Sequence, residues 1–208
     1  MQAQVQAQTS LKGFYSRKLH SLLGVIPLGL FIFEHVFMNS LAYYGQETFM
    51  AAVEMLHSLP FLWVLEIFLI ALPLTYHAIF GIYLAYQAGP SLKEYPTMRN
   101  WFFYLQRISG VVIFVFVLYH VISFNFGPLA ELSAYEKVTT SFTNPLLLSF
   151  YVLGLTSAIF HFVNGLWGFA INWGIITGTR AQRVFSYLTM GAFVIFMAFG
   201  IRMVLSFL

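Results

Sequence analysis

Residues 71–86 read ALPLTYHAIFGIYLAY, a mainly apolar and aromatic stretch with one histidine, His77, near its middle. The whole chain has this character, because 60% of its 208 residues are hydrophobic, only 8% are charged, and the mean hydropathy is +0.80. A water-soluble domain carries about 25% charged residues. The sequence therefore cannot build a water-compatible surface, and we expect an all-α integral membrane protein.

Five apolar segments are long enough to cross a bilayer, which takes about 20 residues in a helix. They cover residues 22–41, 61–80, 108–126, 146–171 and 184–207. The connectors between them contain Gly and Pro, which mark turns, and Asn144 before Pro145 is typical of an N-cap and a first helical turn. We expect a single transmembrane domain over residues 1–208, with five membrane-spanning helices of which the first four form a bundle.

The basic residues predict how the chain is oriented in the cell membrane. Eight of the ten fall on one side: Lys12, Arg17, Lys18, Lys93, Arg99, Arg107, Arg180 and Arg183. Lys137 and Arg202 fall on the other side, so we expect a cytoplasmic N-terminus and a C-terminus outside. We also expect the first segment to be retained, because a signal peptide has an apolar core of about 7–15 residues and this segment is longer and contains Glu34 and His35.

Several function classes are excluded by what the sequence lacks. The chain has no cysteine, which excludes disulfides, thiolate-ligated haem and cysteine-held iron–sulfur clusters within it. Neither a Walker loop nor a dinucleotide-binding glycine pattern follows a strand-like stretch, so we expect no nucleotide or flavin domain. The net charge of +3 comes from basic residues that set the orientation of the chain in the membrane. We therefore expect the chain to be surrounded by membrane lipid, and we expect no nucleic-acid partner.

Each of the first four apolar segments contains one histidine. These are His35, His77, His120 and His161. An ionisable side chain at such depth is costly, and by default it faces a cavity or a partner rather than lipid. A packed histidine bonded to a backbone carbonyl explains any one of them equally well, but four histidines, one per helix, favour a shared ligand-binding role.

The depths of the four histidines sort them into two levels. With a rise of about 1.5 Å per residue, His35 and His120 lie about 20 and about 18 Å from the inner edge of the hydrocarbon core. The second and fourth segments run the other way, which places His77 and His161 about 24 and about 22 Å below the outer edge of a core about 30 Å thick. His35 and His120 therefore share the outer level, and His77 and His161 share the inner level.

Two histidines at one level suit haem iron, which needs two axial protein ligands, better than zinc, which takes three or four. Gly81 and Gly165 each follow their histidine by four residues, and Gly154 and Gly168 lie seven residues to either side of His161. Such glycines leave room for a porphyrin on the histidine face, although close helix packing explains each of them equally well alone. The combination predicts two haem b groups stacked in the four-helix bundle.

Four stretches of the sequence resemble a known family. They are RKLHSLLGVIPLGLFIFEH (17–35), ALPLTYHAIFGIY (71–83), MRNWFFYLQRISGVVIFVFVLYH (98–120) and IFHFVNGLWGFAINWGI (159–175). They are similar to the single-chain, di-haem cytochrome b anchors of succinate:menaquinone oxidoreductases of the Bacillus type. The resemblance implies that His35 and His120 hold an outer haem and that His77 and His161 hold an inner haem, in agreement with their depths.

The resemblance also implies a function and partners. A chain of this kind passes electrons from succinate oxidation, a step of the tricarboxylic acid cycle, to a quinone, menaquinone in this family, within respiratory complex II. It binds a flavoprotein subunit and an iron–sulfur subunit on the cytoplasmic side. Quinone reduction is the one chemical step that we would place at this chain.

Five polar residues at the inner ends of the first and third helices are candidates for binding the propionates of the inner haem. They are Arg17, His20, Ser21, Arg107 and Ser109. Haem propionates need cationic or hydroxyl partners. An ordinary position at the membrane interface explains these residues equally well, so both interpretations stay open.

Glu34 and Glu66 fall in the outer third of the membrane, beside the predicted outer haem. They are candidates for transferring protons to or from the quinone. Buried carboxyl groups suit proton delivery. A structural pairing with Arg202 is the alternative.

Three other functions compete with succinate oxidation. A fumarate reductase anchor would use the same residues in the reverse direction, and the sequence does not separate the two. A cytochrome b of a hydrogenase or formate dehydrogenase is disfavoured by one histidine on each of four helices. A membrane transporter or purely structural anchor would use the histidines without haem, and its purified form would be colourless.

Overall fold

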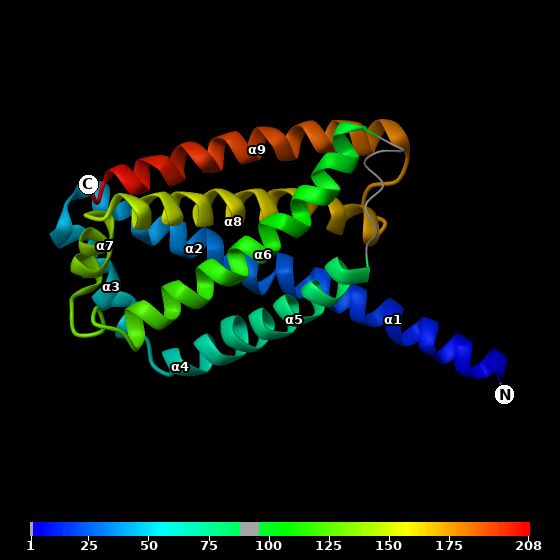
Figure 1. Ribbon diagram of the computed structural model, residues 1–208, viewed down its shortest axis with the longest axis horizontal. Coiled ribbons are helices and arrows are strands. Elements are labelled where there is room, and N and C mark those ends of the chain that lie inside the picture. Colours follow the sequence, from blue (N-terminus) through cyan, green and yellow to red (C-terminus); the bar gives the residue numbers. More distant parts are fainter. Residues whose placement is uncertain (1, 88–95) are drawn as a thin grey trace.

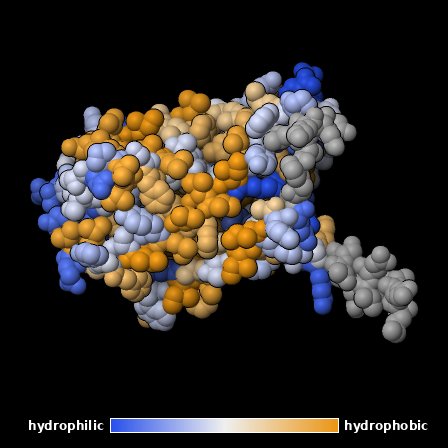
Figure 2. Space-filling model, viewed as in Figure 1, coloured by the Kyte–Doolittle hydropathy of each residue, from blue (hydrophilic) through white to orange (hydrophobic). Residues whose placement is uncertain are grey.

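The computed structural model describes residues 2–87 and 96–208, and this part of the chain contains helices and no strand (Figure 1). Five spans are long and apolar enough to cross a membrane: Leu11–Tyr44, Leu62–Gln87, Met98–Asn125, Pro145–Asn172 and Thr179–Leu205. The predicted all-α membrane protein with five spans is thereby confirmed. Hydrophobic residues cover the middle of the visible face and hydrophilic residues gather towards its two ends (Figure 2). Lys93, one of the eight clustered basic residues, lies outside the described residues.

The first span consists of two helices, α1 (Gln2–Val25) and α2 (Pro27–Ser40), followed by a 3₁₀ turn, η1 (Leu41–Tyr44). Pro27 has no backbone N–H with which to continue α1, and its fixed φ suits the first turn of a new helix. The backbone N–H of Ile26 still bonds to the carbonyl of Leu22 at 2.9 Å. The proline therefore interrupts the helix without ending the span.

The second span changes its helical type part-way. It begins with α4 (Leu62–Leu65), continues as a π-helix, η2 (Glu66–Ala71), and ends as α5 (Leu72–Gln87). Pro73 lies just after the π-helix and lacks the N–H that an α-helix would need there. A proline and a π turn both interrupt the regular hydrogen bonding of an α-helix, and here they lie next to each other.

The other three spans are the continuous helices α6 (Met98–Asn125), α8 (Pro145–Asn172) and α9 (Thr179–Leu205). Asn144 caps α8 as predicted, because its side chain accepts the backbone N–H of Leu146 at 2.9 Å. All three helices extend beyond the predicted apolar segments at their inner ends. An apolar window marks only the part in hydrocarbon, whereas the helix continues into the interface, where aromatic and basic residues are enriched.

The first four spans form a bundle, as predicted. Helix α8 packs against α1 and α6, α5 also packs against α1 and α6, and α9 lies outside this ring against α8 and α2 (Figure 1). The end of the bundle with the N-terminus and the α8–α9 turn is called the inner end, and the opposite end, with the C-terminus, the outer end.

Two short helices cover the outer end, where we expected only connectors. They are α3 (Gln46–His57) and α7 (Ala134–Phe142), which pack against each other. Their buried aromatic side chains, Phe49 and Phe142, belong to one cluster with Tyr151 of α8. Each helix is too short to register as a span, and its stability comes from packing one apolar face on the bundle.

A capping box starts helix α7. Ser133 accepts the backbone N–H of Glu136 at 3.3 Å, and the Glu136 carboxylate accepts the backbone N–H of Ser133 at 2.9 Å. The Ser133 hydroxyl also donates to this carboxylate at 2.7 Å. These bonds favour the charged form and hold the pKa of Glu136 below its ordinary value.

Candidate functional site

The structure brings the four membrane histidines together in two pairs. The ring centroids of His77 (α5) and His161 (α8) lie 6.0 Å apart, and those of His35 (α2) and His120 (α6) also lie 6.0 Å apart. A metal ion bound at about 2 Å by the nitrogens of two opposed imidazoles separates their ring centroids by about 6 Å. Both pairs therefore have the spacing of two axial ligands to one iron.

The pairs offer two protein ligands each. Within residues 2–87 and 96–208, no three His, Asp or Glu side chains are grouped so that they could hold a metal ion. A structural zinc site would need such a group. The arrangement fits haem iron, whose other four ligands come from the porphyrin.

Backbone carbonyls fix the orientation of both inner histidines. His77 Nδ1 lies 2.9 Å from the carbonyl oxygen of His20, and His161 Nδ1 lies 3.0 Å from that of Gln106. A carbonyl oxygen only accepts hydrogen bonds, so each Nδ1 carries the hydrogen and donates it. Nε2 then keeps its lone pair, which is the state of a histidine that binds metal.

The outer pair has mainly aromatic neighbours. The ring of His120 lies 4.5 Å from the ring of Phe124, and its Nδ1 lies 3.4 Å from the hydroxyl of the buried Tyr151. The ring of Phe31 lies 5.3 Å from that of His35, closer than the His120 ring at 6.0 Å. The outer site is thus more apolar than the inner one, and Tyr151 is its polar partner.

Two glycines that the sequence analysis missed lie against the inner histidines. A Cβ atom on Gly24 would lie 2.4 Å from Cε1 of His77, and one on Gly110 would lie 3.1 Å from Cε1 of His161. Only glycine at position 24 leaves room for the imidazole of His77 where it is observed. The sequence did contain a sign of this role for Gly24. Gly24 precedes His35 by eleven residues, which is about three helical turns, so both residues belong to the same side of the first span.

Two comparisons with known proteins show which family the chain resembles. Residues 89–201 match the family described as the succinate dehydrogenase/fumarate reductase transmembrane subunit. Over 198 residues the chain is 43% identical to the succinate dehydrogenase cytochrome b558 subunit of Bacillus subtilis (strain 168), covering 93% of this chain and 96% of the relative.

The chain belongs to this transmembrane subunit family. Membership confirms the resemblance seen in the four sequence stretches and establishes the chain as a membrane-anchor subunit for electron transfer. The positions of the side chains indicate which residues could hold cofactors.

Three of the four glycines expected to make room for a porphyrin in this subunit lie against other side chains. A Cβ on Gly154 would lie 2.4 Å from the Phe116 ring, one on Gly81 would lie 3.2 Å from His20, and one on Gly165 would lie 3.5 Å from a side-chain amide. A Cβ on Gly168 would meet nothing within 4 Å. Close packing of side chains is thus the immediate role of Gly154 and Gly81 in this structure.

The predicted propionate partners on α1 of the subunit lie at the inner end. The His20 ring stacks on the His77 ring with centroids 4.0 Å apart, and His20 Nδ1 is buried without a hydrogen-bond partner. Ser21 accepts the Nε1–H of Trp173 at 3.0 Å, and the exposed Arg17 donates to Gln87 at 3.4 Å. Arg17 and Ser21 therefore also join α1 to the ends of α5 and α8.

The two predicted partners on α6 point in different directions. Ser109 is buried, and its hydroxyl lies 3.3 Å from Nδ1 of His161. The guanidinium of Arg107 lies 3.4 Å from the Phe103 ring, and its Nη1 donates to the Phe103 carbonyl at 2.6 Å. The Nε of Arg107 is buried without a partner.

The two outer carboxyl groups differ in exposure. Glu34 is half-buried on α2, whereas Glu66, at the start of η2, is exposed and not buried as we expected. Arg202, the alternative partner of both, lies over the Tyr43 ring with its guanidinium carbon 3.6 Å from the centroid. Because η2 packs against α2, Glu34 and Glu66 belong to neighbouring elements.

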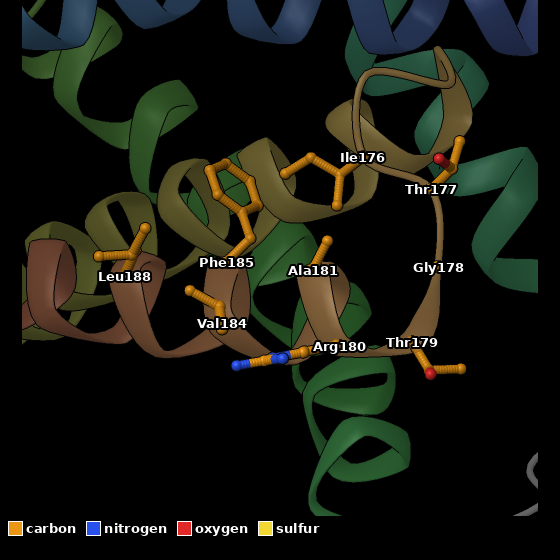
Figure 3. Close-up of a pocket in the computed structure, with 9 residues that line it drawn as sticks. All are labelled: Ile176, Thr177, Gly178, Thr179, Arg180, Ala181, Val184, Phe185 and Leu188. Carbon is orange, nitrogen blue, oxygen red and sulfur yellow. The ribbon is translucent and has the colours of Figure 1, made fainter.

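A surface hollow lies at the inner end, where the α8–α9 turn meets the start of α9 (Figure 3). Apolar side chains such as Ile176, Val184 and Leu188 line much of it, and none of the four paired histidines does. The hollow is therefore separate from the histidine sites.

Proposed function

We propose that this subunit holds two haem b groups between its histidine pairs and passes electrons from succinate oxidation to a quinone. The spacing of 6.0 Å in both pairs carries the proposal. A haem with two histidine ligands supplies a centre that gains and loses one electron. The same residues would serve fumarate reduction if electrons ran in the opposite direction.

The histidines of each pair are proposed as the axial ligands. His77 and His161 would hold the inner haem, with their Nδ1–H groups already bonded to backbone carbonyls. His35 and His120 would hold the outer haem. Two levels of ligands in one bundle give electrons a path across the membrane.

Buried donors at the inner end are proposed to bind the propionates of the inner haem. His20 Nδ1 and Arg107 Nε are buried without a partner, which is unusual enough in a folded protein to require an explanation. Anionic propionates would satisfy both. Arg17 and Ser21 lie at the same end and are the further candidates.

The proposed partners are a flavoprotein subunit and an iron–sulfur subunit at the inner end. The relative from Bacillus subtilis is named as a succinate dehydrogenase subunit, and the present chain has no cysteine to hold an iron–sulfur cluster. The gathering of basic residues at the inner end supports a cytoplasmic location for that end and for the N-terminus. The C-terminus then lies outside.

The proposed quinone site lies at the outer end, beside Glu34 and Glu66, with menaquinone as the substrate. Glu34 directly precedes the proposed ligand His35, and Glu66 begins a π-helix, a feature that is frequent at functional sites. The two carboxyl groups would deliver the protons that quinone reduction consumes.

Glu66→Gln tests this site. Removal of a positioned proton donor should lower quinone-dependent succinate oxidation by about 10²-fold, since general acid catalysis contributes at least that much. Both haems should remain, as measured by reduced-minus-oxidised difference spectra of the same membranes. Glu54→Gln, which changes an exposed carboxyl group on α3, is the matched control. Full turnover in the Glu66→Gln protein would place the quinone elsewhere.

Isolation of the native complex tests the function as a whole. A tagged chain purified from its own membranes should carry a flavoprotein and an iron–sulfur protein with it. Adding succinate to this preparation should produce the spectrum of a reduced b-type cytochrome. A colourless preparation without dehydrogenase subunits would instead favour a transporter or a purely structural anchor.

A further inference from the structure

A chain of side-chain amides connects the inner histidine of α8 to a cation. The backbone carbonyl of Gln106 accepts from His161 Nδ1 at 3.0 Å, and the Gln106 side chain donates back to the His161 carbonyl at 2.9 Å. Asn164 donates to the side-chain oxygen of Gln106 at 2.7 Å. Arg99 in turn donates to the side-chain oxygen of Asn164 at 2.8 Å.

The direction of every hydrogen bond in this network is determined by the groups at its two ends, the Arg99 guanidinium and the His161 carbonyl. A guanidinium only donates, so the oxygen of Asn164 must face Arg99 and its NH₂ group must face Gln106. The carbonyl of His161 only accepts, so Gln106 must present its NH₂ group there. Both amides therefore have a single satisfactory orientation, and the network is fully specified from α6 to α8.

Arg99 contacts two neighbouring helices and is less exposed than Arg180 and Arg183 at the start of α9. Its guanidinium lies 3.7 Å from the centroid of the Trp167 ring, and its Nη1 donates to Ser186 of α9 at 3.4 Å. Arg99 is half-buried where α6, α8 and α9 meet, whereas Arg180 and Arg183 are exposed. A half-buried, immobilised charge is screened much less by salt and water than an exposed one.

We propose that Arg99, acting through Asn164 and Gln106, is a positioning residue for His161 and a fixed charge that raises the reduction potential of the inner haem. The inference rests on the proposed function, because it requires a haem at His161. Arg99 and Gln106 are two turns apart on α6, a rise of about 10 Å. Reduction adds an electron, so a positive charge at this range stabilises the reduced form.

Arg99→Gln in the intact complex tests the charge. In a redox titration that resolves the two haems, the ratio of reduced to oxidised inner haem at a fixed potential should fall about tenfold, or 59 mV for a one-electron couple. The outer haem should titrate as before. Arg180→Gln removes an exposed charge at the same end and should shift neither haem. Arg99→Lys keeps the charge and should restore most of the inner potential.

Asn164→Leu tests the hydrogen-bonded connection, because it leaves Arg99 charged but separates it from Gln106. The low-spin electron paramagnetic resonance signal of the inner haem should shift or broaden as the Gln106 side chain, which donates to the His161 backbone carbonyl, loses its hydrogen bond from Asn164, while the outer signal stays unchanged. Two bound haems with unchanged potentials and signals in Arg99→Gln and Asn164→Leu would overturn the inference. If Arg99→Gln does not assemble, an Arg99→Lys protein whose inner-haem potential falls by about 59 mV or more despite the retained charge would overturn the charge role. A wild-type complex without haem would refute the proposed function itself.

Discussion

Replacing His77 with alanine and replacing His161 with alanine should each remove the same haem, the inner one. Replacing His35 or His120 should remove the outer haem. Each iron would lose one of its two axial ligands, and the remaining imidazole would be left in the membrane-spanning bundle without its partner, which is costly. Haem content should fall from two to one per chain in every variant, as measured by pyridine haemochrome assay and redox titration of the purified complex.

The control for this set is His57→Ala. His57 is exposed at the end of α3, so both haems should remain. A single component lost in both His77→Ala and His35→Ala would contradict the pairing, because these two residues belong to different pairs in the structure.

Gly24→Ala should have the second-largest effect, although it alters no proposed ligand. The new Cβ would lie 2.4 Å from Cε1 of His77, so either α1 or the imidazole must move. Overpacking of this kind costs about 1–3 kcal/mol, and the displaced atom belongs to a proposed ligand. The inner haem should therefore be lost or bound in reduced amount, while the outer haem is retained in the same preparation.

Gly191→Ala is the matched control, because this glycine also lies within a membrane helix, α9, and a Cβ there would meet nothing within 4 Å. Its haem content should equal that of the wild type. Equal occupancy of the inner haem in Gly24→Ala and wild type would show that His77 does not need its observed position.

The sequence was sufficient to predict the spans and the levels of the histidines. Both follow from two constants, the thickness of the bilayer core and the rise of a helix, so a count of residues places His35 near His120 and His77 near His161. The positions of α3 and α7 could not be predicted in this way. Such short helices depend on tertiary packing, here around Phe49 and Phe142.

The residues that contact the histidines also could not be predicted from a single sequence. Gly24 and Gln106 contact histidines of other helices, and those contacts depend on how the helices are rotated and aligned. The exposure of Glu66 has a similar origin, because a π turn changes the direction in which a side chain points and Pro73 was its only signal. The depth of a residue along its own helix can be predicted from residue counts. The side chain that faces it from a neighbouring helix cannot.

The haem content of the purified complex tests the central claim most directly. Two pairs of histidines at 6.0 Å predict two haem b groups per chain in a pyridine haemochrome assay, both low-spin as expected for two histidine ligands. A ratio near two, with both components lost only in a variant that alters both pairs, would support the assignment. A ratio near zero would contradict haem binding, and a ratio of one would leave one histidine pair without its proposed role.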